Sequence, residues 1–226
     1  MVNIDTVYQK VLTLANKEQR GYITPQEFNL FADQAQMEIF EQYFYDLNQL
    51  LRINSNSDEY ADIRDNLQEK ITIFETGNTG TGSIVVANVY RLGTVKMTVD
   101  GLEREVEEVQ EKELMHMLQG PLTKPTLKRP IYVRKRGSIT IYPENNSFAY
   151  NYIRRPTKPN WTYVVVFEKP MWDPNNSSMA HFELHASEEN ELVYKILKFA
   201  GVSMKRDDIM KAGQGMEISQ IQQEKQ

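Results

Sequence analysis

A calcium-loop pattern spans Asn16–Glu27. Gly21 falls at the sixth loop position and Glu27 at the twelfth, as the spacing of an EF-hand requires. However, Arg20 occupies the fifth position, where a ligand oxygen is needed, and its positive charge opposes a bound cation. A simpler role for Glu27 is to be the capping-box partner of Thr24 at the start of a helix. We therefore expect a helix start here and no metal site.

The histidines offer no convincing metal site either. A zinc-protease helix needs Glu directly after its first His, whereas Glu183 stands one place later between His181 and His185. The surrounding residues favour an extended segment, in which residues four apart lie roughly 13 Å from each other. His116 stands alone in its segment. We expect no metal ligands and no cofactor.

Other catalytic patterns are also missing from the sequence. The glycine-rich run Gly77–Gly82 lacks the Lys-Ser/Thr of a P-loop and precedes a strand, so a flexible hinge is the simpler interpretation. The chain has no Cys, which excludes disulfides, thiolate zinc sites and cysteine nucleophiles. It also has no G-x-S-x-G motif. We expect that the protein is not an enzyme.

The charge distribution is the most distinctive feature of the sequence. Between Lys124 and Lys158, nine basic residues and one acid give a local charge of +8. Because the whole chain has a net charge of −5, the remaining residues together carry −13. Such asymmetry is typical of a basic surface that meets nucleic acid or an acidic partner. The candidate residues for a DNA channel or a subunit interface are Lys124, Lys128, Arg129, Arg134, Lys135, Arg136, Arg154, Arg155 and Lys158.

Aromatic residues interleave with this basic segment, as they do in proteins that stack single-stranded nucleic acid. They are Tyr132, Tyr142, Tyr150, Tyr152 and Trp161. On strands with a period of two, half of them must face the core, so a sheet with one solvated basic face is an equally good interpretation.

An acidic stretch lies just before the basic one. It looks like a solvated face, and it could equally be the complementary surface on an adjacent copy. We hypothesise that it meets residues 134–158 of the next copy. Its candidate interface residues are Glu103, Glu105, Glu107, Glu108, Glu111 and Glu113.

Helices are expected at both ends of the chain. The N-terminal region contains a first helix, a long helix from Thr24 to about Arg52, and a third helix after residue 58. The long helix is apolar over too wide an arc for one stripe, so we expect it to be covered on two sides. The chain's own core covers one side, and either a neighbouring subunit or further intramolecular burial covers the other. The candidates for subunit packing are Phe28, Phe31, Phe40, Phe44 and Leu47.

The middle of the chain is expected to be β-rich. Short β-branched strands precede and follow the turn Asp100-Gly101. In the segment 131–154, apolar and polar side chains alternate with period two, which predicts an antiparallel meander. A short helix is expected over Glu111–Gln119. The predicted class is α+β. Residues 1–75 form N-terminal helices and residues 76–185 form a β-rich subdomain. Residues 186–212 form a C-terminal helix that packs on the N-terminal helices, and residues 213–226 form a flexible tail.

No stretch predicts a membrane-spanning helix or a secretion signal. The longest apolar run, Val164–Phe167, is far shorter than the ~20 residues that a spanning helix needs. The N-terminal residues MVNIDTVYQK lack a charged region followed by an apolar one. We expect a soluble intracellular protein with no membrane partner.

Four segments carry a family resemblance: VYQKVLTLANKEQRGYITPQEFNLFADQAQMEIFEQYF, IYVRKRGSITIYPEN, YIRRPTKPNWTY and FELHASEENELVYKILKFAGV. In them the chain resembles small virion structural proteins of short-tailed, crAss-like bacteriophages (podoviruses) and related marine phages. The resemblance spans Tyr8 to about Val202. These are structural signatures rather than catalytic ones, so their specificity rests on order and joint occurrence.

The resemblance implies a head-to-tail connector (adaptor) ring protein that packs beneath the portal and carries the DNA channel onward. It implies a homo-oligomer, a ring of about twelve copies, with the portal and neighbouring connector or tail proteins as partners. Packaged double-stranded DNA would pass through the channel. The location would be the virion, with synthesis in the cytoplasm of the bacterial host. The alternative is a nucleic-acid-binding module that uses the basic, aromatic-rich segment 124–161.

Overall fold

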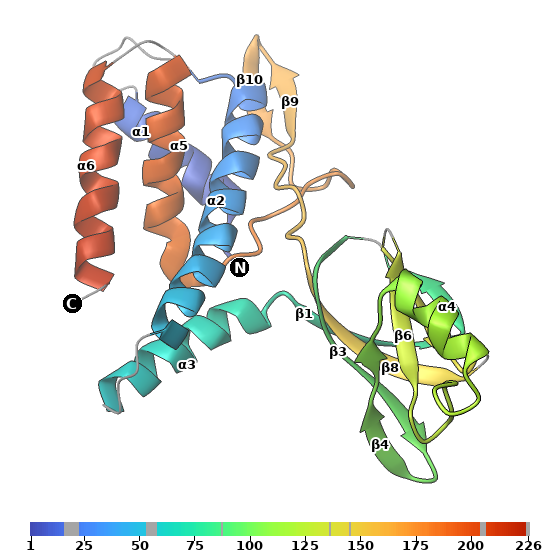
Figure 1. The fold of residues 1–226 in the computed structure, drawn as a ribbon. Helices are drawn as coiled ribbons and strands as arrows, with labels where there is room; N and C mark the ends of the chain where they lie inside the picture. Colours follow the sequence, from blue (N-terminus) through green and yellow to red (C-terminus); the bar gives the residue numbers. More distant parts are fainter. Residues whose placement is uncertain are drawn as a thin grey trace. The chain divides into compact units, whose positions relative to one another are not determined.

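Helices and mostly antiparallel sheets make up the chain, which confirms the α+β class (Figure 1). This computed structural model describes residues 1–15, 23–52, 58–86, 88–135, 137–144, 146–203 and 207–224. The residues form two compact units. A helical unit comprises Met1–Ile73 with Pro156–Gln226, and a β-rich unit comprises Phe74–Arg155. The β-rich unit is therefore inserted between the two halves of the helical unit.

The helical unit is built around α5. Its helices are α1 (Ile4–Ala15), α2 (Pro25–Arg52), α3 (Asp58–Thr72), α5 (Glu189–Ser203) and α6 (Asp207–Glu224). Helix α5 packs against α1, α2 and α6, and α3 packs against α2. Apolar side chains at helical spacing meet in this core, among them Val7, Val11, Phe28, Ile39, Phe40, Leu192 and Ile196, and Phe182 of the extended segment joins them.

The N-terminus of α2 is a capping box, as the sequence predicts. The Thr24 N–H and hydroxyl both donate to Glu27 Oε2, at 3.0 and 2.7 Å, and the Glu27 N–H donates to Thr24 Oγ1 at 3.3 Å. The hydrogen bonds from Thr24 lower the pKa of Glu27. Reciprocal bonding of this kind satisfies the free N–H groups of the first helical turn.

Residues 156–185 return to the helical unit, and two side chains of α2 hold them there. Gln36, fully buried, donates from Nε2 to the Thr157 carbonyl at 2.8 Å and accepts from the Glu183 N–H at 3.0 Å. Asn29 accepts from the Trp161 N–H at 2.8 Å and donates to the Trp161 carbonyl at 3.2 Å. The expected β-rich subdomain of 76–185 is therefore too long, because its last part belongs to the helical unit.

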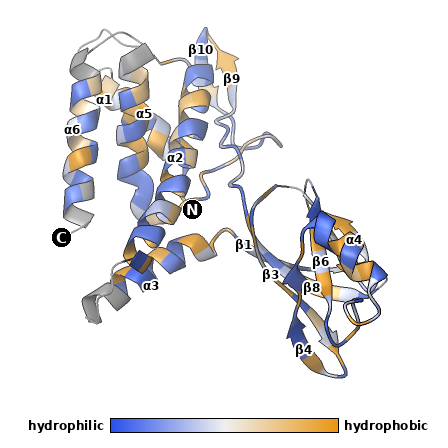
Figure 2. Cartoon of the chain, in the orientation of Figure 1, coloured by the Kyte–Doolittle hydropathy of each residue, from blue (hydrophilic) through white to orange (hydrophobic). Residues whose placement is uncertain are grey.

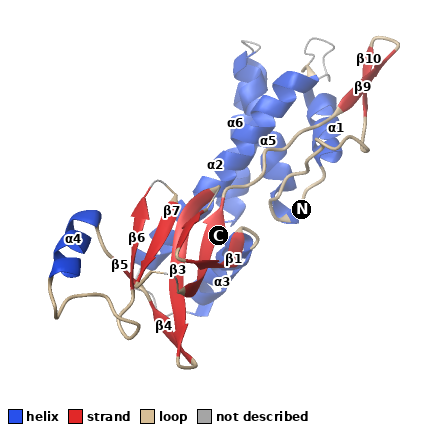
Figure 3. Cartoon of the chain, turned by 90° about the vertical axis from the view of Figure 1, so that its right-hand side faces the viewer, coloured by secondary structure: helices blue, strands red, loops and turns tan. Residues whose placement is uncertain are grey.

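Within the returning segment, β9 (Tyr163–Val166) and β10 (Lys169–Trp172) form a two-stranded hairpin of their own (Figure 3). Its base is fixed by Thr162, whose hydroxyl donates to the Asp173 carbonyl at 2.6 Å. Trp161 stacks between Tyr8 and Tyr163, with ring centroids 4.1 and 5.8 Å away. These contacts anchor the hairpin base in the helical core.

The β-rich unit consists of two four-stranded sheets that share two bent strands. Their orders are β1-β8-β3-β4 and β2-β7-β6-β5. The strands are β1 (Glu75–Thr81), β2 (Ser83–Val85), β3 (Val89–Val99), β4 (Leu102–Glu105), β5 (Glu107–Glu108), β6 (Ile131–Lys135), β7 (Ser138–Tyr142) and β8 (Ser147–Arg154). The chain passes from β1 into β2 at Gly82 and from β4 into β5 at Val106.

The bend at Gly82 requires glycine, because its φ of 67° lies in the left-handed region. Its N–H donates to the Asn146 carbonyl at 3.2 Å, and its own carbonyl accepts from the Ile141 N–H at 3.1 Å. One strand can thus serve both sheets. The two sheets enclose a core of Val86, Val95, Met97, Val99, Val106, Tyr132, Ile139, Ile141, Phe148 and Tyr150.

Helix α4 (Glu111–Gln119) lies on the other side of β6, so that strand is covered on both faces (Figure 1). Leu114 of α4 packs with Ile131 and Val133 of β6, while Tyr132 faces the core between the sheets. This double cover follows from the alternation of side chains along a strand. The predicted bounds of α4 agree with the structure.

Two expectations for glycine-containing segments are wrong. The run Gly77–Gly82 is a paired strand and its corner, not a hinge. A Cβ on Gly80 would lie 2.8 Å from Ile84 Cγ2 and 3.4 Å from the Phe148 ring, so glycine makes room for the core. The tail expected over 213–226 is helical as far as Glu224, as the second half of α6.

Candidate interaction surfaces

The basic segment divides between the two units. Lys124, Lys128 and Arg129 lie in the exposed loop between α4 and β6, and Arg134 and Lys135 are the exposed last residues of β6. The cations Arg154 and Arg155 stand at the end of β8, whereas Lys158 belongs to the helical unit. Arg136 lies outside the described residues. The nine cations therefore do not form one strip on one unit.

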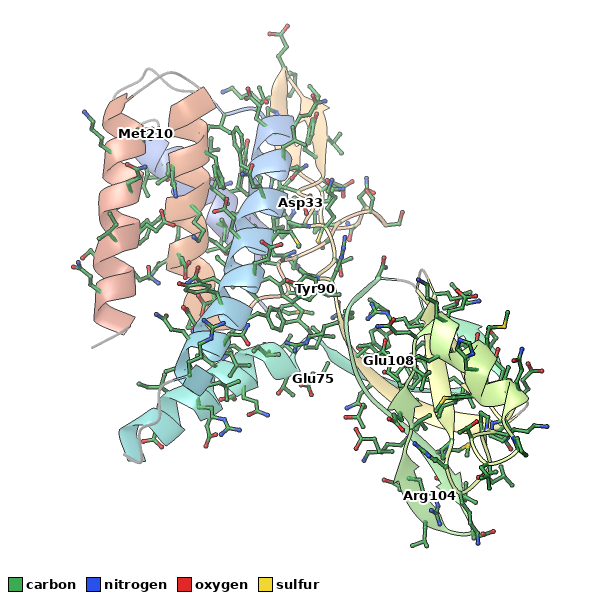
Figure 4. The ribbon with its side chains drawn as sticks, in the orientation of Figure 1. Asp33, Glu75, Tyr90, Arg104, Glu108 and Met210 are labelled. Carbon is green, nitrogen blue, oxygen red and sulfur yellow. The ribbon has the colours of Figure 1, made fainter. Side chains whose placement is uncertain are left out.

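Several of these cations are already paired within the chain. Arg129 Nη2 lies 3.6 Å from Glu107 Oε2, and Lys135 forms an ion pair with Glu111. Lys158 Nζ lies 3.2 Å from an oxygen of Asp33, on α2 (Figure 4). By contrast, Lys124, Lys128, Arg134 and Arg155 are exposed and make no ion pair with any other described residue. These four are the cations most available to a partner.

The glutamates of the acidic stretch are exposed, as expected, although Val106 and Val109 between them are buried. Its six glutamates lie on β4, β5 and α4, where Glu103, Glu105, Glu107, Glu108, Glu111 and Glu113 all face solvent. Glu103 pairs with Lys96 at 3.2 Å, and Glu107 and Glu111 pair with the basic segment of the same chain. The acidic and basic stretches thus complement each other within one copy.

Tyr132 links these two stretches below the surface. Its hydroxyl donates to Glu108 Oε2 at 2.9 Å, and the ring is buried between the sheets. Burial, together with the hydrogen bond and negative charge of Glu108 (Figure 4), raises the pKa of Tyr132 to about 12. This aromatic residue is structural.

The other interleaved aromatics are wholly or partly buried. Tyr150 and Trp161 are buried, and Tyr142 and Tyr152 are half-buried. Tyr150 stacks on Tyr152 with ring centroids 5.8 Å apart. Of the two interpretations of the sequence, the solvated basic face is the one that agrees with these positions.

The expected subunit-packing residues of α2 are mostly inside their own unit. Phe28, Phe40 and Phe44 are buried, and Phe31 and Leu47 are half-buried. Phe31 packs near Phe199 of α5, with ring centroids 6.4 Å apart. The buried phenylalanines cannot serve a neighbouring copy, because the chain's own core already covers them.

The β9–β10 hairpin is an uncovered apolar feature of the helical unit, and it contains the longest apolar run of the sequence. Val164, Val165, Val166 and Met171 are all exposed, and Phe167 at the tip is 95% exposed. Figure 2 shows the hydrophobic colour of β9. A contiguous exposed apolar patch is typical of an interaction site. The sequence indicates this exposed surface by a run of three valines and a phenylalanine, because a strand without alternating polar residues is apolar on both faces.

Two of the three histidines, His181 and His185, have structural roles. His185 Nδ1 accepts from the Ser187 N–H at 3.3 Å, which caps the helical turn before α5, and His181 Nδ1 accepts from the Ile4 N–H at 3.3 Å. Among the described residues, no group of three or more His, Asp or Glu side chains is placed to hold a metal ion. Residues 16–22, the first part of the calcium-loop pattern, lie outside the described ranges.

Comparison of the sequence with models of protein families gives no match, and comparison with curated proteins gives no significant match. In the part of the chain that the structure describes, no helix combines the length and the apolar character needed to cross a membrane. The surfaces described above are therefore the basis for a functional proposal.

Proposed function

We propose that this chain is a structural subunit of a bacteriophage particle, which forms a ring in the head-to-tail connector below the portal and continues the DNA channel. The observation that carries the proposal is the β9–β10 hairpin, whose exposed valines and phenylalanine suit burial against another protein. The resemblance of the sequence to virion structural proteins supplies the class of assembly. In this proposal the protein has no catalytic role.

A ring subunit needs two different surfaces, because each copy contacts one neighbour on each side. The hairpin is one candidate for such a surface. In the β-rich unit, the cations Lys124, Lys128 and Arg134 supply positive charge that would face packaged DNA or an acidic neighbour. The proposed partners are further copies of the chain, the portal, adjoining connector or tail proteins, and double-stranded DNA.

Quantitative mass spectrometry of purified virus particles tests this function by counting copies of the chain per particle. Roughly a dozen copies are expected for a single closed ring. Hundreds of copies would instead indicate a capsid or decoration role. Absence from the particle would refute the structural proposal.

The second candidate function is a nucleic-acid-binding module, and the four available cations Lys124, Lys128, Arg134 and Arg155 favour it. Because the neighbouring aromatics are buried or half-buried, such binding would use phosphate contacts alone. Its affinity should fall steeply with salt, since each neutralised phosphate releases a counterion. Tight, salt-sensitive DNA binding by the isolated chain would place this function first, whereas weak binding agrees with a channel wall.

A further inference from the structure

The β9–β10 hairpin is apolar on both faces. In its register Val164 pairs with Met171 and Val165 pairs with Pro170. Because side chains alternate along a strand, the Val164 pair lies on one face and the Val165 pair on the other. An isolated two-stranded hairpin is at best marginally stable in water. A partner must therefore cover this hairpin from more than one side to remove its apolar surface from water.

The tip of the hairpin is strained. Phe167 and Glu168 have φ values of 49° and 63°, in the left-handed region that Asn-Gly normally occupies in a two-residue hairpin turn. A bulky aromatic residue in this conformation costs conformational free energy, and strain of this kind concentrates where it serves a function. Here the strained turn presents a phenylalanine ring and a carboxylate to solvent.

A matching concavity lies elsewhere on the helical unit. Helices α5 and α6 form a groove of about 670 Å³. Its lining includes Asn190, Tyr194, Lys211, Gly215, Met216 and Ser219. The volume falls in the range of pockets that hold a small organic group. The apolar atoms of Tyr194 and Met216 suit a phenyl ring, and Lys211 suits a carboxylate.

The groove cannot receive the hairpin of its own chain. In Figure 1, α6 stands at one side of the helical unit and the hairpin at the other, with α5 and α2 between them. Two complementary patches at different places on one subunit produce a head-to-tail contact, which closes into a ring when the rotation allows.

We propose that the β9–β10 hairpin of one copy inserts Phe167 into the α5–α6 groove of the next copy, with Glu168 facing Lys211. This inference rests on the proposed function, because it names the contact by which copies of the ring subunit join. The opposite charges of Glu168 and Lys211 select a second copy as the occupant, and the phenyl ring fills the space beside Gly215.

The first test replaces the tip by Phe167→Asn with Glu168→Gly. This pair suits the turn, so a merely structural role predicts a more stable hairpin and unchanged association. Our proposal predicts an equal or higher melting temperature together with loss of self-association, measured by sedimentation velocity over a concentration series. Association at the wild-type level would overturn it.

The second test fills the groove with Gly215→Leu. A Cβ at Gly215 meets nothing within 4 Å, so the variant should fold and its helix should gain propensity. We expect association to be lost. A charge exchange follows, in which Glu168→Lys alone weakens association at least tenfold and Lys211→Glu in the same chain restores it. Absence of rescue would contradict the assigned pairing.

Disulfide trapping gives a covalent readout of the contact. Because the chain has no native Cys, only the introduced cysteines can react. The double variant Glu168→Cys with Lys211→Cys joins the two positions that the proposal places face to face, so it should form a ladder of covalent multimers on oxidation. Each single variant can reach only a covalent dimer, and so serves as the control. A double variant that stops at dimers, or does not cross-link, would refute the head-to-tail contact.

The outcomes separate this inference from the proposed function. A ladder from a chain that is absent from virus particles would uphold the contact and refute the connector role. About a dozen copies per particle, with assembly unaffected by the tip and groove variants, would uphold the connector role and refute the contact.

Discussion

At the scale of single residues, the helical unit depends on polar side chains buried at its centre. Gln36 is fully buried on α2 and uses both ends of its amide to hold two separate backbone segments. A polar side chain in this position stabilises the fold only while all of its partners stay in place. The joint between the returning segment and α2 is therefore sensitive to a single substitution.

Replacing Gln36 with Met keeps the volume but leaves the Thr157 carbonyl and the Glu183 N–H without their partner. We expect a loss of about 3 kcal/mol in the free energy of unfolding, because two buried groups lose their hydrogen bonds. Denaturant titration measures it. The matched control is Gln34→Met, at an exposed position of the same helix, which should change stability by less than about 0.5 kcal/mol. Equal effects would contradict the prediction.

Tyr132 should make stability depend on alkaline pH. Its pKa is raised from 10.0 to about 12 in the folded chain, so the unfolded chain loses the phenolic proton first. The raised pKa contributes stability below pH 10, and this contribution disappears as the pH rises towards 12. Relative to Tyr132→Phe, the wild type should thus lose stability over that interval. A constant difference between the two proteins would show that Tyr132 titrates normally.

At the scale of elements, α6 shows how tertiary contacts decide a helix that composition disfavours. Its sequence contains two glycines and many glutamines. Yet Glu217, buried, accepts from Lys195 Nζ at 2.7 Å and from Lys198 Nζ at 3.0 Å, both on α5. Gly213 brings the two helices close, since a Cβ there would lie 3.0 Å from the Lys198 backbone nitrogen.

The two glycines of α6 should respond in opposite ways to alanine. Gly213→Ala should destabilise the chain by about 1 kcal/mol, because its Cβ meets the α5 backbone and the helices must separate. Gly215→Ala should stabilise it by about 0.7 kcal/mol, because the new Cβ meets nothing and the helical propensity rises. Thermal unfolding of the two variants measures both changes. Shifts of the same sign would be inconsistent with this packing.

The interaction of Glu217 with Lys195 and Lys198, which joins α6 to α5, should be lost in acid. Burial acts to raise the pKa of Glu217, but the hydrogen bonds and charges of Lys195 and Lys198 outweigh it and lower the pKa below 4.5. The stability that Glu217 contributes is therefore present above pH 4.5 and lost as the pH falls through the lowered value. The hydrogen-exchange protection factors of the α6 amides should therefore fall in that range.

The same interaction can be removed at neutral pH by Glu217→Gln. We expect a loss of about 2 kcal/mol and a flatter pH dependence, since Lys195 keeps only its weaker contacts with Glu191 and Glu38. Glu189→Gln breaks the partly exposed pair with Lys10 and serves as the control, with a change below about 0.5 kcal/mol. A pH profile identical to that of the wild type would refute the role of Glu217.

The same elements explain how much of the structure the sequence could predict. The capping box of Thr24 and Glu27 fixes the start of α2, and the amphipathic residues of α4 fix its bounds, because both signals are local. The predictions of a hinge at β1 and a flexible tail at α6 are wrong because glycines there make room for residues of other elements, Phe148 and Lys198. The buried state of the α2 phenylalanines depends on α5, which periodicity alone does not place.

At the scale of the whole molecule, the β-rich unit begins and ends at one place. Glu75 pairs with Ile153, and the Arg154 N–H donates to the Phe74 carbonyl at 3.0 Å. Closely spaced ends are typical of an inserted unit that can fold alone. The excised segment 74–155 should therefore unfold cooperatively in a single thermal transition. A broad transition without a defined midpoint would show that it needs the helical unit.

This nested chain order has a consequence for biosynthesis. A ribosome releases α1, α2 and α3 first, then the whole β-rich unit, and only then the extended segment and α5 that complete the helical core. The inserted unit can therefore reach its native state during translation, while the face of α2 that packs against α5, including Phe31, is still uncovered. The half-made chain is most exposed to aggregation during this interval, which ends only when α5 emerges.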